Sequence, residues 1–438
     1  MAFHDTQANH VDYEPLHLVA TRLLIVLSVI FALLPYGLSW DYTGTSSLTM
    51  DGSIAVKLEW GSLFAIAAIM MYRSPHASLS NLRTLNPFLV LVLFWCILST
   101  IWSPLPAVTF KRAIQLYGLT MIALSIQQIP NALNELVRYL SYTLLALLLL
   151  SLFVVITSPS MGIDYALGGA WRGALSQKNE LGQVAAICIL LWQVRACLER
   201  VDVKVLVFAL LFSVFMLVMS KSSTSIIITL LTSACFHLLR KRYLQSSYAL
   251  TRILVSLICL AILLVYGFYM KESRLPTWAE ISGPIAGIFG KGTDLTGRTD
   301  IWELVLLEIN RHWLFGLGYG AFWLGPDSLS QFVIDALHWI PLQSHNGYLD
   351  ILNEQGMIGL ALTGLTILAQ AWSLVQLSHL NRVQAAFWSA MLLIVIITNF
   401  TESSLFRGFG FQNVFFIIAL VSVRTSIRKL KEAGVPDQ

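Results

Sequence analysis

The sequence predicts an all-α, polytopic membrane protein with about twelve transmembrane helices. Of its 438 residues, 56% are hydrophobic and only 12% are charged, whereas about a quarter of the residues in a soluble protein are charged. The mean hydropathy is +0.71. Apolar runs of about 20 residues recur along the chain, and they must be helical because lipid offers the backbone no hydrogen-bond partners. A β-barrel would instead show short alternating segments.

The apolar runs follow one another along the chain and indicate a single integral membrane domain over residues 1–438. No Lys or Arg precedes Arg22, so the first run lacks the basic start of a cleaved signal peptide, and we expect it to be retained as a helix. The cysteines lie within or at the ends of apolar runs, which favours packing over disulfides. The predicted spans have centres near residues 28, 63, 94, 119, 147, 190, 212, 230, 261, 366, 392 and 418.

Basic residues are unevenly distributed among the connections between these runs. Connections rich in Lys and Arg alternate with poor ones such as residues 41–51, and the positive-inside rule then places both termini in the cytoplasm. The net charge of +4 is not gathered into one patch, so nucleic acid is not an expected partner. The basic residues that support this topology are Arg73, Arg83, Arg195, Arg200, Lys204, Arg240, Lys241, Arg242, Arg252, Arg382, Arg424, Arg428, Lys429 and Lys431.

This topology places three connections outside the cytoplasm: residues 104–109, 159–180 and 271–346. The last one is a large loop of about 75 residues between the ninth and tenth predicted spans, long enough to predict a function of its own. We find no internal repeat and no matched pair of Gly/Pro-interrupted spans, which argues mildly against a two-repeat transporter. We therefore expect the functional polar residues to lie in these connections, outside the cytoplasm.

The first external polar cluster lies just before the sixth predicted span. Arg172, Lys178 and Asn179 stand there at a helix entrance, where free backbone N–H groups also favour an anion such as phosphate. The alternative is that both cations are interfacial anchors whose side chains extend to the lipid headgroups, as most juxtamembrane cations do.

The second cluster precedes an amphipathic helix with apolar residues at helical spacing from Trp302 to Trp313. Asp300, with Glu303 three positions on, resembles an N-cap and its reciprocal partner. Arg298 lies just before this predicted start. Its planar guanidinium suits bidentate contacts to phosphate oxygens, although pairing with Asp294 or Asp300 is an equally good reading.

The third candidate is His345, one of three histidines in the loop with His312 and His338. Their spacing matches no compact metal-ligand motif, and we expect no metal site. A lone histidine usually has a structural role, but His345 stands between Ser344 and Asn346 at the entry to the tenth span. There it could act as a general base on a hydroxyl near neutral pH.

Two familiar phosphate signatures are absent. The run from Gly290 to Thr293 lacks the Ser or Thr that follows the lysine of a phosphate loop. No Asp-x-Asp pair occurs, so the usual cation-holding signature of nucleotide-sugar transferases is missing. Any sugar donor is therefore expected to carry a different leaving group.

Taken together, the motifs resemble those of the O-antigen ligase and O-antigen or exopolysaccharide polymerase superfamily, the Wzy/WaaL-like membrane glycosyltransferases. Each motif is weak alone, but their order and the large external loop are fairly specific and extend over most of the chain. The matching pieces are Ser99-Thr100-Ile101-Trp102-Ser103-Pro104 with Lys111-Arg112, Arg172-Gly173 with Lys178-Asn179, Gly297-Arg298-Thr299-Asp300-Ile301-Trp302, Gly316-Leu317-Gly318-Tyr319-Gly320, Ser344-His345-Asn346-Gly347-Tyr348 and Glu354-Gln355-Gly356-Met357-Ile358-Gly359.

The resemblance implies a GT-C-like fold in the bacterial inner membrane, with short helices in the large periplasmic loop. It implies a metal-independent, inverting transfer of glycan from undecaprenyl diphosphate at the periplasmic face, without a cofactor. By resemblance, His345 activates the acceptor hydroxyl, and Arg172 and Arg298 bind the diphosphate with Lys178 in support.

The remaining candidates support this site. A diphosphate leaving group gains charge as the glycosidic bond breaks, and cations must neutralise it when no Mg²⁺ is used. Asp350 or Glu354 could orient the imidazole of His345 or serve as the base themselves. The other supporting residues are Asn179, Asn346 and Arg112.

Several functions stay open at this point. The acceptor decides between a polymerase, which extends another lipid-linked unit, and a ligase, which glycosylates the lipid A core; the run from Gly318 to Trp323 favours a polymerase slightly. A transporter of lipid-linked sugars would need charges within the spans and sites on both faces, and a structural subunit would need no external site. Expected partners are the lipid-linked donor, the acceptor glycan or lipid A core, the bilayer and a chain-length regulator or other assembly proteins.

Overall fold

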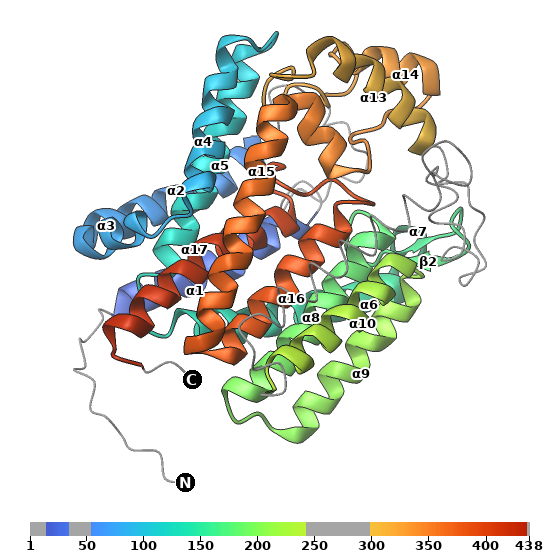
Figure 1. Cartoon of the computed structure of the whole chain (residues 1–438). Coiled ribbons are helices and arrows are strands. Elements are labelled where there is room, and N and C mark those ends of the chain that lie inside the picture. The colour runs from blue at the N-terminus through green and yellow to red at the C-terminus, as the bar shows by residue number, and fades with distance from the viewer. Residues whose placement is uncertain (1–14, 35–53, 242–297, 436–438) are drawn as a thin grey trace, which may run out of the picture.

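The computed structural model describes residues 15–34, 54–241 and 298–435 (Figure 1). Helices dominate these ranges, and the one sheet in them is a two-stranded antiparallel hairpin with Ile163 opposite Trp171. The predicted all-α class is confirmed. The elements are α1 (Pro15–Leu33), α2 (Ile54–Arg73), α3 (Pro75–Arg83), α4 (Pro87–Leu98), the 3-10 helix η2 (Ser99–Ile101), α5 (Pro106–Ile126), α6 (Ala132–Thr157), α7 (Pro159–Gly162), β1 (Ile163–Asp164), β2 (Ala170–Trp171), α8 (Lys178–Leu198), α9 (Val203–Met219), α10 (Ser223–Leu239), α13 (Arg298–His312), α14 (Gln331–Leu337), α15 (Gly347–Leu380), α16 (Arg382–Thr398) and α17 (Phe411–Glu432).

Five of the described helices are long and apolar enough to cross a membrane: α1, α2, α6, α8 and α15. The bent pair of α3 and α4, which turns by 96°, would add a sixth span. Every predicted span centre within the described residues falls inside a helix, and the ninth, near residue 261, lies outside them. A multi-pass membrane protein is thus supported, while the count of about twelve spans and the GT-C-like architecture stay predictions.

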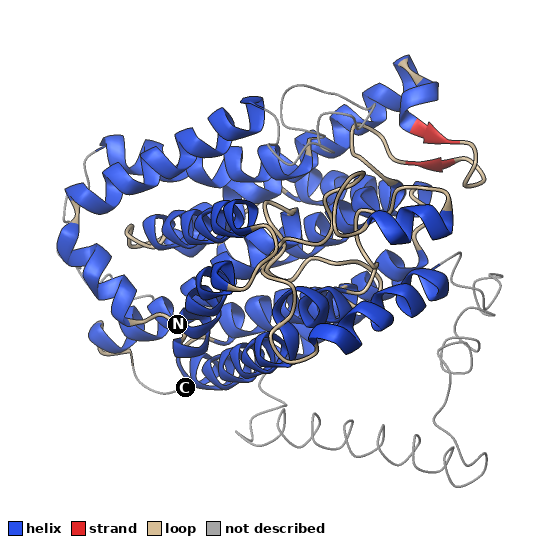
Figure 2. Ribbon diagram, turned by 90° about the horizontal axis from the view of Figure 1, so that it is seen from above, coloured by secondary structure: helices blue, strands red, loops and turns tan. Residues whose placement is uncertain are grey.

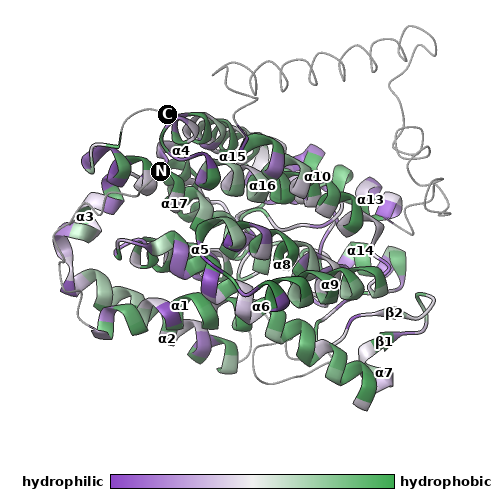
Figure 3. Cartoon of the chain, turned by 90° about the horizontal axis from the view of Figure 1, so that it is seen from below, coloured by the Kyte–Doolittle hydropathy of each residue, from purple (hydrophilic) through white to green (hydrophobic). Residues whose placement is uncertain are grey.

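Helix α8 lies at the centre of the bundle. It contacts α6, α9, α10 and α16, and 72% of the residues in its 18-residue apolar stretch are buried. Trp192 on α8 and Trp388 on α16 are among the largest fully buried side chains of the described residues. Hydrophobic residues cover most of the helices, while α13 carries more hydrophilic ones (Figure 3).

The bundle has two different ends. At one, His17 near the start of α1 bonds to Gln128 through Nε2 and Oε1 at 2.7 Å, and Lys429 near the end of α17 donates to the carbonyl of Gln127 at 2.6 Å. We call this the tail end. The opposite, loop end holds α13, α14 and the start of α15 (Figure 1), and loops cross the helix ends in the view from above (Figure 2). The membrane side that each end faces stays a prediction.

Helix α15 is broken at Gly356, whose φ of 68° and ψ of −172° are not helical. The break leaves backbone N–H and C=O groups of α15 without partners in the helix, and residues 313–318 supply hydrogen bonds to them. The carbonyls of Asn353 and Glu354 accept from the amides of Leu317 and Gly318 at 3.0 and 2.8 Å, and Met357 donates its amide to the carbonyl of Trp313 at 2.8 Å. Buried backbone groups need such partners, so the glycine-rich run is the structural complement of the break.

Contact between these segments requires glycine. Gly316 has a φ of 70°, and a Cβ added there would lie 2.5 Å from the backbone nitrogen of Gln355. At Gly356, an added Cβ would lie 2.2 Å from the carbonyl oxygen of Leu314. The motif from Gly316 to Gly320 and the motif from Glu354 to Gly359 therefore pack with their backbones in direct contact.

Helix α13 corrects two details of the prediction. It includes Arg298 and has Asp300 inside its first turn, so the prediction that the helix starts after Arg298 with Asp300 as its N-cap was wrong. The buried face holds Ile301, Val305 and Ile309, which belong to a small apolar cluster. Trp313, predicted on this face, is 55% exposed because the helix ends at His312. Residues 271–297 of the predicted loop lie outside the described residues.

We expect Gly316→Ala to lower the unfolding free energy by about 2 kcal/mol or more. Alanine is strained in the left-handed backbone conformation of residue 316, and its Cβ would also clash with the backbone of α15. The measurement is the thermal unfolding midpoint of the purified protein in detergent. Gly364→Ala, also on α15, is the control: no atom lies within 4 Å of its added Cβ, and helix propensity predicts a gain of about 1 kcal/mol. Equal midpoints for the two variants would contradict the backbone packing described here.

Candidate functional site

A single buried carboxylate, Glu402, gathers polar groups at the loop end. It lies between α16 and α17 and is only 7% exposed. Its Oε1 accepts from Asn179 Nδ2 at 2.9 Å and lies 3.5 Å from Arg298 Nη2. Its Oε2 accepts from Gln343 Nε2 at 2.9 Å and lies 3.1 Å from His345 Nδ1. We call these five residues the Glu402 cluster.

The loop that carries Glu402 is held by hydrogen bonds of its own. The Asn399 side chain accepts from the amides of Ser404 and Leu405 at 3.0 Å each, and its backbone carbonyl accepts from the amide of Gly347 at 2.9 Å. A Cβ at Gly347 would lie 1.9 Å from Asn399 Oδ1, so only glycine allows this approach. The turn before α15 and the loop after α16 are thereby fixed to each other.

His345 is positioned from both of its neighbours. Asn346 caps α15, because its Oδ1 accepts from the backbone N–H of Tyr348 at 3.1 Å, and the carbonyl of Ser344 accepts from Trp302 Nε1 at 2.8 Å. His345 itself has a φ of 55°, a left-handed conformation that histidine adopts more readily than most residues. These contacts direct its Nδ1 at Glu402.

The second ring nitrogen of His345 is available for chemistry. Its Nε2 has no hydrogen bond within the described residues, and the side chain is 21% exposed. A neutral imidazole that donates Nδ1–H to Glu402 presents Nε2 as a proton acceptor. This pairing of a carboxylate with a histidine resembles the orienting half of a catalytic triad.

The charge on Glu402 is stabilised in spite of its burial. Burial raises the pKa of this carboxyl, but the hydrogen bond from His345, the charge of Arg298 and the side-chain amide of Asn179 outweigh it and hold the pKa below its usual value. Burial lowers the pKa of Arg298, and Glu402 opposes that effect. Arginine stays protonated in proteins, so the buried Glu402 and the partly buried Arg298 form a pair of opposite charges.

The other predicted donor-binding residues lie on the segment that leads into α8. Arg172 donates through Nε to the carbonyl of Met161 at 2.6 Å and through its amide to Gly162 at 2.9 Å, which fixes it to the start of the hairpin. Lys178 is the first residue of α8, next to Asn179 of the Glu402 cluster, and its ammonium makes no ion pair among the described residues. A shared cavity for Arg172 and the cluster stays a prediction.

Asp350, proposed from the sequence as an alternative base, is engaged elsewhere. It is 4% exposed, lies 2.5 Å from Arg407 Nη1 through Oδ2 and accepts from Trp323 Nε1 at 2.8 Å. Arg407 also donates to the carbonyl of Leu342. Asp350 therefore fixes the loop of Glu402 and the segment before His345 to α15.

Glu354 and Arg112 hold Gly320 from two directions. Glu354 Oε2 accepts from the amide of Gly320 at 3.0 Å, and Arg112 Nη1 donates to the carbonyl of the same residue at 2.6 Å. Their observed contacts support the glycine-rich run. Among the described carboxylates, the one in contact with the His345 imidazole is Glu402.

Glu402 is not among the site residues predicted above, although the sequence carries a signal for it. Glu402 is the only acidic residue between Glu354 and Glu432. A lone carboxylate between two strongly apolar runs, on the side predicted to be external, is expected to have a partner or a function. Its partners could not be read from the sequence because they lie on separate segments.

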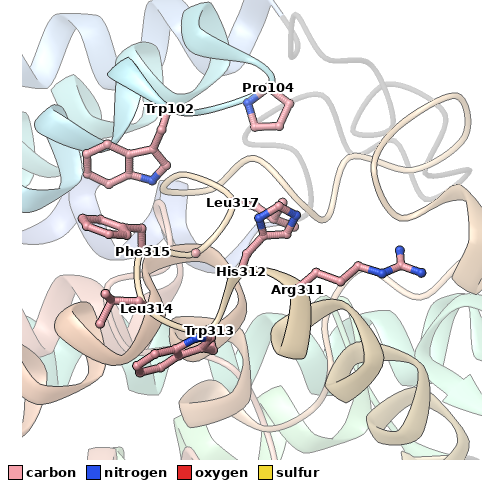
Figure 4. A pocket seen from close by; sticks show the side chains of 9 residues that line it. Trp102, Pro104, Arg311, His312, Trp313, Leu314, Phe315 and Leu317 are labelled. Atoms are coloured by element: carbon pink, nitrogen blue, oxygen red, sulfur yellow. The ribbon is translucent and has the colours of Figure 1, made fainter.

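A separate pocket of about 480 Å³ opens at the other end of α13 (Figure 4). No residue of the Glu402 cluster lines it, and α13 alone spans about 20 Å between the two places. We base the candidate site on the cluster, because that is where buried charges converge. No group of three potential metal ligands occurs in the described ranges. The pocket is lined by Trp102, Pro104, Arg311, His312, Trp313, Leu314, Phe315, Gly316 and Leu317.

The fold and the site define a multi-pass membrane protein with a polar, histidine-containing site at one end of its helix bundle. Residues 208–364, less than half of the chain, match the model of the O-antigen ligase family, Wzy_C. This match confirms the resemblance to the O-antigen ligase and polymerase superfamily. It supports a glycosyltransferase-like activity on lipid-linked glycan and an acceptor in a membrane. No curated protein matches the chain.

We expect Glu402→Gln to lower the unfolding free energy by about 1–3 kcal/mol at pH 7, because the amide leaves buried donors unpaired. The pKa of Glu402 is depressed on folding, so its contribution is fully present above the unfolded value of about 4.3 and is lost as the pH falls through the folded value. The difference from the wild type should therefore shrink at acidic pH.

The measurement is the thermal unfolding midpoint of both proteins between pH 7 and pH 4. Glu308→Gln is the control, because Glu308 pairs with the exposed Arg311 at 3.0 Å, and such pairs contribute little. A difference between wild type and Glu402→Gln that grows towards low pH would refute the role of the ionised carboxylate.

Proposed function

We propose that this protein is a periplasmic-face glycosyltransferase that moves glycan from undecaprenyl diphosphate to an acceptor sugar hydroxyl. The observation that carries the proposal is the Glu402 cluster, in which an oriented histidine and a partly buried arginine meet at one carboxylate. Transfer to a hydroxyl needs a base, and departure of a diphosphate needs cations. The family match supports both substrates in general terms.

In the proposed reaction, an acceptor hydroxyl attacks the anomeric carbon of the donor. His345 Nε2 takes the hydroxyl proton. Glu402 meanwhile accepts a hydrogen bond from Nδ1–H and stabilises the imidazolium that forms. The bond from the anomeric carbon to the diphosphate oxygen breaks, and undecaprenyl diphosphate leaves with the bonding electrons. A single displacement of this kind inverts the anomeric configuration.

Arg298 and Lys178 are the proposed diphosphate ligands at the cluster, with Arg172 nearby in sequence. The guanidinium of Arg298 lies 3.5 Å from Glu402, longer than a normal charged hydrogen bond, so a second anion can compete for it. Glu402 keeps Asn179 and Gln343 as donors when Arg298 turns away. With these cations neutralising the leaving group, we propose that transfer needs no divalent metal.

The identity of the acceptor decides which kind of glycosyltransferase we propose. We favour a second lipid-linked glycan, which would make the enzyme an exopolysaccharide or O-antigen polymerase. An O-antigen ligase would instead use the lipid A core with the same donor chemistry. Incubation of the purified protein with donor alone distinguishes them: a polymerase forms longer lipid-linked chains, and a ligase forms a conjugate only when lipid A core is added.

His345→Ala is expected to reduce the transfer rate about 100- to 10,000-fold, the range typical of a lost general base. The measurement is product formation from undecaprenyl diphosphate-linked glycan, with EDTA present throughout. The matched control is His338→Asn, which changes an exposed histidine of the same loop. His338 has a left-handed φ of 59°, and asparagine adopts this conformation more readily than most residues. An unchanged rate in His345→Ala, or loss of wild-type transfer in EDTA, would overturn this mechanism.

Arg298→Ala is expected to raise the KM for the donor about ten- to a hundredfold and to affect the KM for the acceptor less. Initial rates are measured at varied donor and fixed acceptor concentrations, and then the reverse. The control is Arg311→Ala on the same helix, where the side chain is 73% exposed. If both variants weaken donor use equally, positive charge on α13 in general is responsible, and the specific assignment to Arg298 fails.

A further inference from the structure

A second polar pocket lies at the tail end of the bundle, far from the Glu402 cluster. It has a volume of about 370 Å³ and opens where the ends of α3, α15 and α17 meet. This volume falls in the range of small-molecule sites. The lining residues are Arg83, Thr84, Ser373, Gln376, Arg424, Ile427, Arg428, Lys431 and Glu432.

The pocket carries an uncompensated positive charge. Its one carboxylate, Glu432, already lies 3.4 Å from Arg428 Nη1, and Arg428 also donates to Asn81 Oδ1 at 2.8 Å. Arg83, Arg424 and Lys431 have no acidic partner within ion-pair distance among the described residues. Arg424 is also partly buried, on the face of α17 that lines the pocket.

Other arginines at the same end of the bundle are neutralised within the chain. Arg22 pairs with Glu135 at 2.7 Å, and Arg138 lies 3.7 Å from the same carboxylate. Glu199 pairs with both Arg138 and Arg195. The positive-inside rule accounts for the side on which basic residues lie, but not for this division into paired and unpaired groups.

We propose that this pocket binds a phosphate group, either of an anionic lipid or of a soluble phosphate. A partly buried guanidinium without a counter-charge is unfavourable, and an anion in the pocket relieves it. Arginine forks suit the bidentate geometry of phosphate, and the side-chain amide of Gln376 supplies a neutral donor. Basic pockets between the ends of membrane helices take up anionic lipid headgroups in this manner.

The test uses the full-length protein in a zwitterionic detergent. The thermal unfolding midpoint is followed while phosphatidylglycerol, phosphatidylcholine or inorganic phosphate is added. Phosphatidylglycerol is expected to raise the midpoint, and the double variant Arg83→Gln/Arg424→Gln should need about tenfold more of it for the same shift. Arg200→Gln, an exposed cation beside the paired group, is the control and should behave as the wild type.

The outcomes separate the two sources of phosphate. A shift with phosphatidylglycerol alone identifies a lipid headgroup site, and a shift with inorganic phosphate that the double variant loses identifies a site for a soluble anion. If the double variant does not purify as a monodisperse protein, the exposed Lys431→Gln replaces it, with a smaller change in the same direction. No shift with either ligand, or shifts that the pocket variants and Arg200→Gln share equally, would overturn the proposal.

Discussion

The burial of one negative charge organises the loop end of this protein. An isolated carboxylate removed from water is strongly unfavourable, so Glu402 can be buried only where several donors meet it. Those donors come from the start of α8, the start of α13 and the segment before α15. Formation of the folded state therefore requires these segments, distant in sequence, to converge on the loop between α16 and α17. His345 is one of the groups that this requirement brings into place.

A second constraint is the break of α15 at Gly356. The short helix before it, residues 347–355, carries Asp350 towards Arg407 in the loop of Glu402, and Glu354 towards Gly320 in the glycine-rich run. The freed backbone groups at the break bind that same run. The segment that follows His345 is thus held on several sides. A histidine on such a framework loses little conformational freedom when substrate arrives, which favours a preorganised site.

Composition and periodicity predict the helices because the bilayer leaves few alternatives for an apolar run. The motifs around Arg298 and His345 could also be found, since each is a local string of residues. Glu402 could not be assigned, because a hydrogen bond between residues 223 positions apart, as between Asn179 and Glu402, leaves no local pattern. The N-cap prediction for Asp300 failed for a related reason: a capping pattern four residues long is weaker than the packing of Ile301 and Val305, which sets where α13 lies.

The geometry around Arg298 also bears on how binding and catalysis are linked. Arg298 is the most distant of the four partners of Glu402. In the proposed reaction, a diphosphate that draws Arg298 away would remove one compensating positive charge from Glu402 and leave His345 as the partner that becomes cationic when it takes the acceptor proton. In this proposal, donor binding to Arg298 and proton transfer to His345 both act on the same carboxylate, so the two steps are linked through Glu402.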